Sequence, residues 1–365
     1  MRRQYNYLRH VFSSLFNLDK TIIFTILALA VINIIIQYSA TDRVITKLVT
    51  DTGYLIISFI LLFIVANINL NHLKRLAIPF YVFTLLCLVA VLIFGVTSHG
   101  AKRWLNVGFR IQPSELCKLS VPLVLACYYS LRTNLSSYWE YLWGFIIILL
   151  PCVLIAKQPD LGTAILVFFA GVFVLFFVGL PWRIIVIGML VLIASTPVIW
   201  HFLHDYQQHR ILTLLNPQSD PLGKGYHIIQ GIIAIGSGGI YGKGYLHGTQ
   251  SHLDFIPEKH TDFVISVLAE EFGFIGVGVV LFLYGLLIIR ALMVMQQAHG
   301  TFSKVLAGSI AMSFTLYVLI NMGMVSGILP VVGVPLPFIS YGGTATIVLM
   351  LGFGILLAIA RENKY

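Results

Sequence analysis

Long apolar runs separated by short polar segments dominate the chain from residue 21 onward. A helix of about 20 apolar residues spans a bilayer, so runs of that length can be counted as transmembrane helices. Such runs lie near residues 21–38, 54–69, 78–97, 113–131, 141–156, 160–179, 183–203, 263–290, 303–327 and 341–360. The pattern predicts an all-α polytopic membrane protein with about ten transmembrane helices. We expect one integral membrane domain over residues 1–365.

One polar segment, residues 204–262, is far longer than the others and separates the seventh apolar run from the eighth. Its apolar stretch HIIQGIIAIGSGGI and its aromatic residues favour a small ordered cap over a disordered linker. Its glycine-rich part, GSGGIYGKGYLHG (236–248), lacks the Gly-Lys-Ser/Thr of a P-loop. A tightly turning loop is the simpler interpretation, and cradling of a phosphate by backbone amides is the alternative.

Lys and Arg residues in short connections orient a membrane protein, because they are enriched on the cytoplasmic side. One set of segments holds Arg2, Arg3, Arg9, Lys20, Lys74, Arg75, Arg132, Arg183, Arg290, Lys304, Arg361 and Lys364. We assign this side, with both termini, to the cytoplasm. The first apolar run is expected to be a retained span, because no signal-peptide cleavage site follows it.

The composition, 58% hydrophobic and 10% charged residues, excludes an ordinary soluble domain. The net charge of +9 favours lipid headgroups or phosphate-bearing lipids as partners over nucleic acid. Outside the cytoplasm, the cations are concentrated in residues 98–112, at Lys157 and in residues 204–262. Positive charge kept on the outer side indicates an anionic substrate there.

Ionisable residues inside apolar runs are costly and usually functional. Glu115 and Lys118 lie three residues apart, on one face of a helix that begins near Pro113. They form either a self-neutralising structural pair or a polar cavity that receives a charged headgroup. Glu270 and Glu271 are adjacent and cannot share a face, so we expect structural hydrogen bonds for both. One would face the bundle interior and the other a polar partner in the cytoplasmic half.

Two aspartates precede apolar runs, and each has a structural and a functional interpretation. Asp160 ends the KQPD turn, and Asp262 ends the IPEKHTD segment. Aspartate is a good N-cap, so either side chain would satisfy free amides at a helix start. Against this, Ser or Thr would cap at a lower desolvation cost, and both aspartates lie beside basic residues on the same side.

The separate charged clusters converge on the outer third of the bundle under this topology. Their members are Arg103, Arg110, Glu115, Lys118, Lys157, Asp160, Arg210, Glu258, Lys259, His260 and Asp262. Independent helix caps would not be expected to gather so many charges on one side. We interpret the cluster as the wall of an outward-facing active site.

Several long motifs occur here in the order typical of a known family. They are GAKRWLNVGFRIQPSELCKL, QPDLGTA, DPLGKGYHIIQ, AIGSGG, GKGYLHGTQS, PEKHTDFVISVLAEEFG and GILPVVGVPLPFISYGG. With them the chain resembles the SEDS family (shape, elongation, division and sporulation), and most closely its rod-shape-determining elongation members. The resemblance implies a multi-helix fold in the bacterial cytoplasmic (inner) membrane, with a large extracytoplasmic loop between helices 7 and 8.

The resemblance also implies a peptidoglycan glycosyltransferase that polymerises lipid II during cell elongation. Its expected partners are a class B penicillin-binding protein and other elongation-machinery proteins. An inverting transfer with undecaprenyl pyrophosphate as leaving group needs a base for the sugar hydroxyl and cations for the diphosphate. By resemblance Asp262 is the candidate base, or a ligand of an assisting divalent cation (Mg²⁺ or Mn²⁺), for which Asp160 is the second candidate ligand. No other cofactor is expected.

The remaining candidates are assigned to substrate binding. They are Arg110, Glu115, Lys118, Lys157, Asp160, Arg210, Glu258, Lys259 and His260. The cations expected to contact the diphosphate are Arg110, Lys118, Lys157 and Arg210. Glu115 is expected to orient Lys118, and Asp160 is expected to bind sugar or metal.

A lipid II flippase is the alternative function, because helices with internal polar groups also suit a transporter. A flippase needs a charged path that reaches both leaflets. The inner third of the bundle offers few candidates beyond Glu270 and Glu271. This asymmetry favours the polymerase.

The topology predicts that a cysteine introduced at Ser219 is labelled by a membrane-impermeant reagent in intact spheroplasts. A cysteine near the N-terminus should be protected in the same cells and react only after lysis. Protection at residue 219 together with labelling at the N-terminus would reverse the topology.

Overall fold

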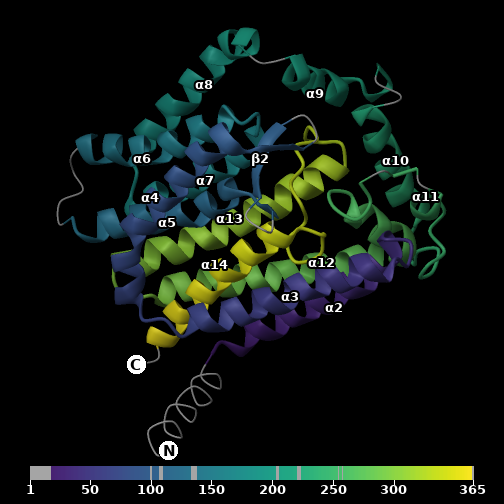
Figure 1. Cartoon of the computed structure of the whole chain (residues 1–365), viewed down its shortest axis with the longest axis horizontal. Coiled ribbons are helices and arrows are strands. Elements are labelled where there is room, and N and C mark those ends of the chain that lie inside the picture. The colour runs from purple at the N-terminus through teal and green to yellow at the C-terminus, as the bar shows by residue number, and fades with distance from the viewer. Residues whose placement is uncertain are drawn as a thin grey trace, which may run out of the picture.

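A computed structural model describes residues 18–98, 101–106, 110–132, 138–202, 205–219, 223–253, 255–256 and 258–363. Long helices pack side by side over most of this part of the chain (Figure 1). They are α2 (Lys20–Ala40), α3 (Ile45–Ala66), α4 (Leu70–Phe94), α5 (Pro113–Ser130), α6 (Tyr138–Ala156), α7 (Leu161–Val178), α8 (Trp182–Phe202), α12 (Val264–Gln297), α13 (Thr301–Val325) and α14 (Gly343–Glu362).

The ten long helices among the described residues match the ten apolar runs in position. Eight of them are long and apolar enough to cross a membrane. The other two are α5, which carries the Glu115/Lys118 pair, and α8, which is apolar over Trp182–Val198. The predicted all-α polytopic fold is therefore confirmed, and the chain is a multi-pass membrane protein.

Helix α13 lies at the centre of the bundle, where it packs against α5, α7, α12 and α14. Aromatic side chains fill the space between these helices. The ring of Phe314 on α13 lies 5.1 Å from that of Phe353 on α14 and 5.7 Å from that of Tyr284 on α12, both edge to face. Edge-to-face pairs add to the gain from burial, so this cluster fixes the spacing of the three helices.

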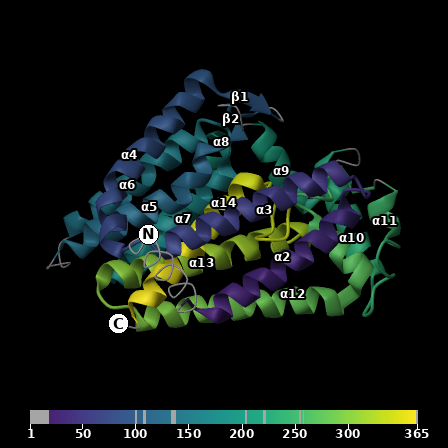
Figure 2. The ribbon, with the colours of Figure 1, turned by 60° about the horizontal axis from the view of Figure 1, so that its bottom comes forward.

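The long polar segment folds into short helices at one end of the bundle, as the predicted ordered cap requires. They are α9 (Asp205–Leu215), the 3₁₀ turn η1 (Pro217–Ser219), α10 (Lys224–Ser237) and α11 (Thr249–His252). In both views α10 and α11 lie at the end of the bundle away from the end of α14 (Figures 1 and 2). We call the end that carries α10 and α11 the cap end.

A small antiparallel sheet precedes α5, which the helical prediction did not anticipate. Its strands β1 (Val96–Ser98), β2 (Ala101–Asn106) and β3 (Arg110–Ile111) pair in chain order. Val96 lies opposite Trp104, and Leu105 lies opposite Ile111. The sheet leads the chain into the start of α5 at the cap end.

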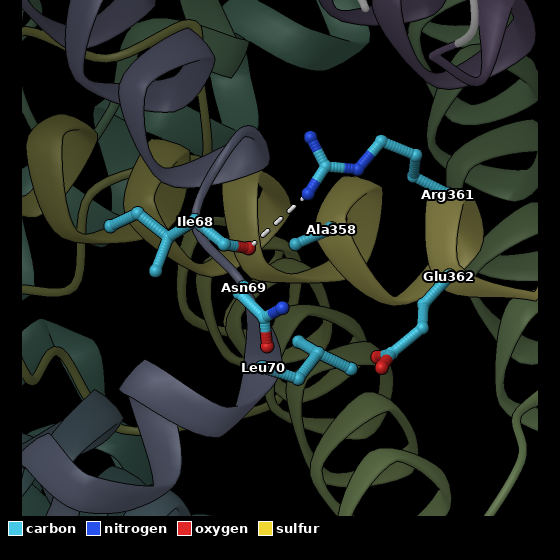
Figure 3. Close-up of a pocket in the computed structure, with 6 residues that line it drawn as sticks. All are labelled: Ile68, Asn69, Leu70, Ala358, Arg361 and Glu362. Atoms are coloured by element: carbon cyan, nitrogen blue, oxygen red, sulfur yellow. Dashed lines mark hydrogen bonds between the residues drawn. The ribbon is translucent and has the colours of Figure 1, made fainter.

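The opposite end of the bundle is held by polar contacts of its own. Arg361, in the last turn of α14, donates to the carbonyl oxygen of Asn67 in the turn between α3 and α4. It also donates to the carbonyl oxygen of Ile68 (Figure 3). A pocket at this place is lined by Ile68, Asn69, Leu70, Ala358, Arg361 and Glu362. The guanidinium of Arg361 already binds backbone carbonyls, so this place holds the end of α14 against the turn between α3 and α4.

Helix α12 is broken at Gly273, whose φ of 65° and ψ of −161° are far from helical values. The glycine-rich loop supplies the hydrogen bonds that the break removes. The amides of Lys243 and Gly244 donate to the carbonyls of Glu270 and Glu271 at 2.9 and 3.1 Å. The amides after the break, of residues 274 and 275, donate to the carbonyls of residues 239 and 240 at 2.9 and 3.2 Å.

This pairing needs glycine because the two backbones are in direct contact. A Cβ on Gly242 would lie 2.1 Å from the carbonyl oxygen of Glu271, and one on Gly238 would lie 2.0 Å from that of Ala269. The loop is thus a structural partner of α12, in agreement with the simpler interpretation of its glycines. Its amides at residues 243 and 244 are used by α12.

Glu270 and Glu271 make structural hydrogen bonds, as expected, but their expected location was wrong in part. Glu270 accepts from the Lys243 ammonium and the Gln250 amide, both at 2.8 Å, and Glu271 accepts from the Ser39 hydroxyl. All of these partners lie at the cap end, so neither carboxylate reaches the opposite half. The break at Gly273 explains why both carboxylates stay at the cap end. The backbone on either side of the break is hydrogen-bonded to the glycine-rich loop.

Replacement of Gly242 by alanine is expected to destabilise the protein, because the new methyl group would overlap the Glu271 carbonyl. We expect a loss of about 2 kcal/mol or more, seen as a lower melting temperature in detergent. Gly236→Ala is the matched control, since a Cβ there meets nothing within 4 Å. Equal melting temperatures for the two variants would contradict the close backbone contact.

Candidate functional site

Asp262 lies in a turn at the cap end, in a non-helical stretch that we call the site loop (residues 258–263). Its side chain is half-buried, and a Cβ on Gly333 would lie 3.4 Å from its Oδ2 atom. The N-cap of α12 is Phe263, which makes no side-chain capping bond. The structural interpretation of Asp262 as a helix cap is therefore wrong.

The three residues that precede Thr261 have different positions, and two of them shape the site loop. The Lys259 ammonium is buried between the Asp42 carboxylate, at 2.8 Å, and the Ser251 carbonyl, at 2.7 Å. Glu258 accepts from the Thr261 hydroxyl at 2.8 Å, within the same turn. Lys259 therefore ties the site loop to the α2–α3 turn and to α11, which leaves little of its charge for a substrate.

His260 is half-buried, with its ring 6.1 Å from that of Tyr341. Burial, and then the charge of Lys47, lowers the pKa of its imidazole. The ring is therefore mainly neutral at pH 7, because the ordinary pKa of histidine already lies below 7. A neutral imidazole offers one donor and one acceptor to a substrate rather than a positive charge.

Glu115 and Lys118 form a buried ion pair in the first turns of α5, with 2.6 Å between the ammonium and Oε1. Tyr317 of α13 completes a triad. Its hydroxyl donates to the second oxygen of Glu115 at 3.1 Å and accepts from the Lys118 ammonium. The ammonium also lies 4.4 Å from the centre of the Tyr317 ring. Each charge is thus compensated in the absence of a ligand.

Asp160 caps α7, as its structural interpretation predicted. Its carboxylate accepts from the Thr163 amide at 3.3 Å and the Thr163 hydroxyl at 2.9 Å. It also accepts from Gln112 at 2.9 Å and pairs with Arg103 at 3.8 Å. Four interactions occupy the two oxygens, so a sugar or a metal would have to displace one of them.

Helix α13 joins the charged triad to the site loop. Tyr317 and Asn321 are one turn apart on this helix, and Asn321 donates to the carbonyl of Asp262 at 3.0 Å. The start of α7 is close as well, because a Cβ on Gly162 would lie 3.1 Å from the Val332 carbonyl. The stretch around Val332 is thus bordered by Asp262, by the start of α7 that Asp160 caps, and by the triad on α5 and α13.

The structure places the other cationic candidates farther out. Arg110 on β3 and Lys157 in the turn before α7 are exposed, and Arg210 on α9 is half-buried. Their assignment to the diphosphate remains a prediction from the sequence.

Three polar residues of this region were missed at the level of the sequence. Tyr317 and Asn321 lie in an apolar run, where a single aromatic or amide residue gives no signal by itself. Asp51 on α3 is 4% exposed, and its Oδ2 atom has no hydrogen-bond partner among the described residues. Asp51 precedes the predicted run 54–69, and only the earlier start of α3 at Ile45 brings it into the bundle.

The described residues contain no group of three or more His, Cys, Asp or Glu side chains that converge as a metal site. Asp160 fits a metal poorly, because its oxygens bind Thr163, Gln112 and Arg103. Magnesium usually takes one or two carboxylates and completes its coordination with phosphate oxygens and water. The ligand role of Asp262 stays a prediction from the sequence.

Comparison with known proteins identifies relatives over nearly the whole chain. The chain is 47% identical to peptidoglycan glycosyltransferase MrdB of Escherichia coli K12 over 350 residues, 95% of each protein. It is 38% identical to MrdB of Helicobacter pylori over 312 residues, which cover 83% of this chain and 80% of that protein.

Solved structures agree with this similarity in fold. One, described as the structural coordination of polymerization and crosslinking by a peptidoglycan synthase complex, aligns with a TM-score of 0.83 and 33% identity over 95% of this chain and 98% of that one. The rod shape determining protein RodA of Thermus thermophilus aligns with a TM-score of 0.73 and 28% identity, with the same coverage. The model of the cell cycle protein family matches residues 13–365. The chain therefore belongs to the cell cycle protein family of FtsW, RodA and SpoVE.

Proposed function

We propose that this protein is a peptidoglycan glycosyltransferase that polymerises lipid II during cell elongation, with Asp262 as the general base. The observation that carries the proposal is the position of Asp262. Its carboxylate is half-buried at the cap end, in a fixed turn, and it does not cap the helix that follows. The enzyme names of the MrdB relatives support the same class of reaction.

The reaction transfers a sugar from a lipid diphosphate to a sugar hydroxyl. Asp262 removes the proton of the sugar hydroxyl while the hydroxyl oxygen attacks the anomeric carbon of the donor. The bond between that carbon and the diphosphate oxygen breaks, with inversion, and undecaprenyl pyrophosphate leaves as an anion. A leaving group of this kind needs stabilisation by cations rather than a general acid.

Lys118 is the best-placed cation for the leaving group, because the triad can exchange one of its contacts for a phosphate oxygen. Its side chain is 8% exposed and lies against Glu115 and Tyr317. When a diphosphate enters, Glu115 and Tyr317 would orient the ammonium. Arg110 and Lys157 are exposed and would attract the anionic headgroup on its way in.

A divalent cation, Mg²⁺ or Mn²⁺, would add positive charge at the leaving group. In the alternative role to that of base, Asp262 would hold this cation together with phosphate oxygens of the substrate. The proton transfer and the orientation of Lys118 remain tasks of the protein itself.

We further propose that both termini lie in the cytoplasm, that the cap end faces the outside of the inner membrane, and that a class B penicillin-binding protein binds this chain. The segments assigned to the cytoplasm carry twelve Lys and Arg residues and, as acidic residues, only Asp19, Glu140 and Glu362, which supports the orientation. The partner is suggested by the peptidoglycan synthase complex, whose description couples polymerization to crosslinking.

A flippase is less well supported, because the charged residues gather at the cap end. The two carboxylates that would extend a path inward are fixed there, Glu270 by Lys243 and Glu271 by Ser39. No observation on the described helices favours a charged route across the membrane.

Replacement of Asp262 by asparagine tests the base, because the amide keeps the shape of the side chain and removes its charge. We expect the rate of lipid II polymerisation by the purified complex to fall about 10²- to 10⁴-fold. Asp19→Asn is the matched control, since Asp19 caps α2 at the opposite end and pairs with Arg290. Asp262→Asn with more than about a tenth of the wild-type rate would refute the catalytic role.

Exchange of the two charges of the triad separates substrate binding from structure. If Lys118 binds the diphosphate, Lys118→Glu stays inactive even when Glu115→Lys restores the ion pair. The control is the same exchange between Arg132 and Glu140, which are 3.2 Å apart beside Tyr128 at the opposite end of α5. We expect that exchange to preserve polymerisation, measured as glycan length on a gel. Recovery of activity in the Glu115/Lys118 exchange would instead favour a structural pair.

A further inference from the structure

A buried carboxamide on α13, Asn321, bonds two non-helical segments at once. Its Nδ2 atom lies 3.0 Å from the carbonyl oxygen of Asp262 in the site loop. The same atom lies 2.7 Å from the carbonyl oxygen of Val334, in the stretch between α13 and α14 that we call the return segment (residues 326–342). Asn321 is 0% exposed, so both of its N–H donors serve these two carbonyls.

A second carboxamide, Gln37 on α2, makes the same kind of double contact. Its partner in the site loop, His260, lies two residues before Asp262. The Nε2 atom of Gln37 lies 2.9 Å from the carbonyl oxygen of His260 in the site loop and 3.0 Å from that of Ile339 in the return segment. Gln37 is also 0% exposed. The Tyr341 amide donates to the same His260 carbonyl at 3.0 Å.

The chemistry explains why amides occupy these positions. Two carbonyls that leave the helical path inside a bundle each need a donor, and an unmet buried group costs several kcal/mol in a membrane. A hydroxyl carries one donor, and an aliphatic side chain carries none. An amide carries two N–H groups at a fixed angle, so one residue sets the separation of two backbone segments.

We propose that Asn321 and Gln37 are positioning residues, which hold Asp262 at a fixed place against the return segment. This rests on the proposed role of Asp262 as the base. Asn321 bonds the backbone of Asp262 and that of Val334, and the neighbour of Val334, Gly333, faces the carboxylate. The position of the carboxylate over Gly333 is therefore set through one amide. A displacement of about 1 Å is enough to cost about 100-fold in rate.

The test compares near-isosteric variants without donors, Asn321→Leu and Gln37→Met, with the wild-type protein in complex with its transpeptidase partner. We expect kcat for lipid II polymerisation to fall about 10- to 100-fold in each, with KM within about threefold. The control is Ser309→Ala on the same helix, which removes a bond of 2.7 Å to the Ala170 carbonyl far from Asp262. It should keep kcat within about twofold.

Double variants decide whether the amides act through Asp262. In the Asp262→Asn background, Asn321→Leu should cause no further loss, because a base that is absent cannot be misplaced. An equal further loss in that background would overturn the proposal. So would a kcat within about twofold of wild type in both amide variants.

Hydrogen exchange separates this inference from the proposed function. Peptides that cover residues 258–263 should exchange faster in Asn321→Leu and Gln37→Met than in Ser309→Ala, and unchanged exchange would overturn the clamp. If Asp262→Asn retains its rate, the proposed base fails, and the exchange data still report on the clamp. If Asn321→Leu does not fold, Gln37→Met decides the outcome by the same measurements.

Discussion

A backbone that leaves the helical path inside a bilayer must still find partners for its N–H and C=O groups, because no water reaches them. Three stretches of this protein meet that requirement at the cap end. The break at Gly273 is bonded by the glycine-rich loop, and the site loop and return segment are bonded by Asn321 and Gln37. The irregular backbone that carries Asp262 exists because these partners are in place.

The same requirement explains most of the charged residues at the cap end as parts of the structure. Lys259 and Asp160 were predicted at the outer boundary, and Glu270 and Glu271 were predicted deeper in the bundle. All four are bonded to a turn, a helix start or a loop at the cap end. Asp262 differs, because its backbone is fixed while its carboxylate is half-buried and does not cap α12. The Glu115–Lys118–Tyr317 triad lies between these cases, since its charges are paired with each other.

The helices were predictable because a length of about 20 apolar residues is a strong and local signal. The breaks were not. Gly273 lies in an apolar run rich in glycine, and nothing local tells a packing glycine from one with a φ of 65°. Asn321 and Tyr317 were equally hidden, since their roles depend on partners up to 202 residues away along the chain. Asp262 was found from the charged cluster before the eighth apolar run, and its role as base came from the family resemblance. Its support from α2 and α13 required the structure.

The bonds between the glycine-rich loop and α12 have a consequence for biogenesis. Residues 239–244 precede the break in order of synthesis, so the loop emerges from the ribosome before the helix that it completes. The carbonyls of Glu270 and Glu271 cannot find their donors until that loop has folded back onto α12. Folding of the cap and completion of α12 are therefore coupled steps, and a misfolded loop would leave this span unfinished.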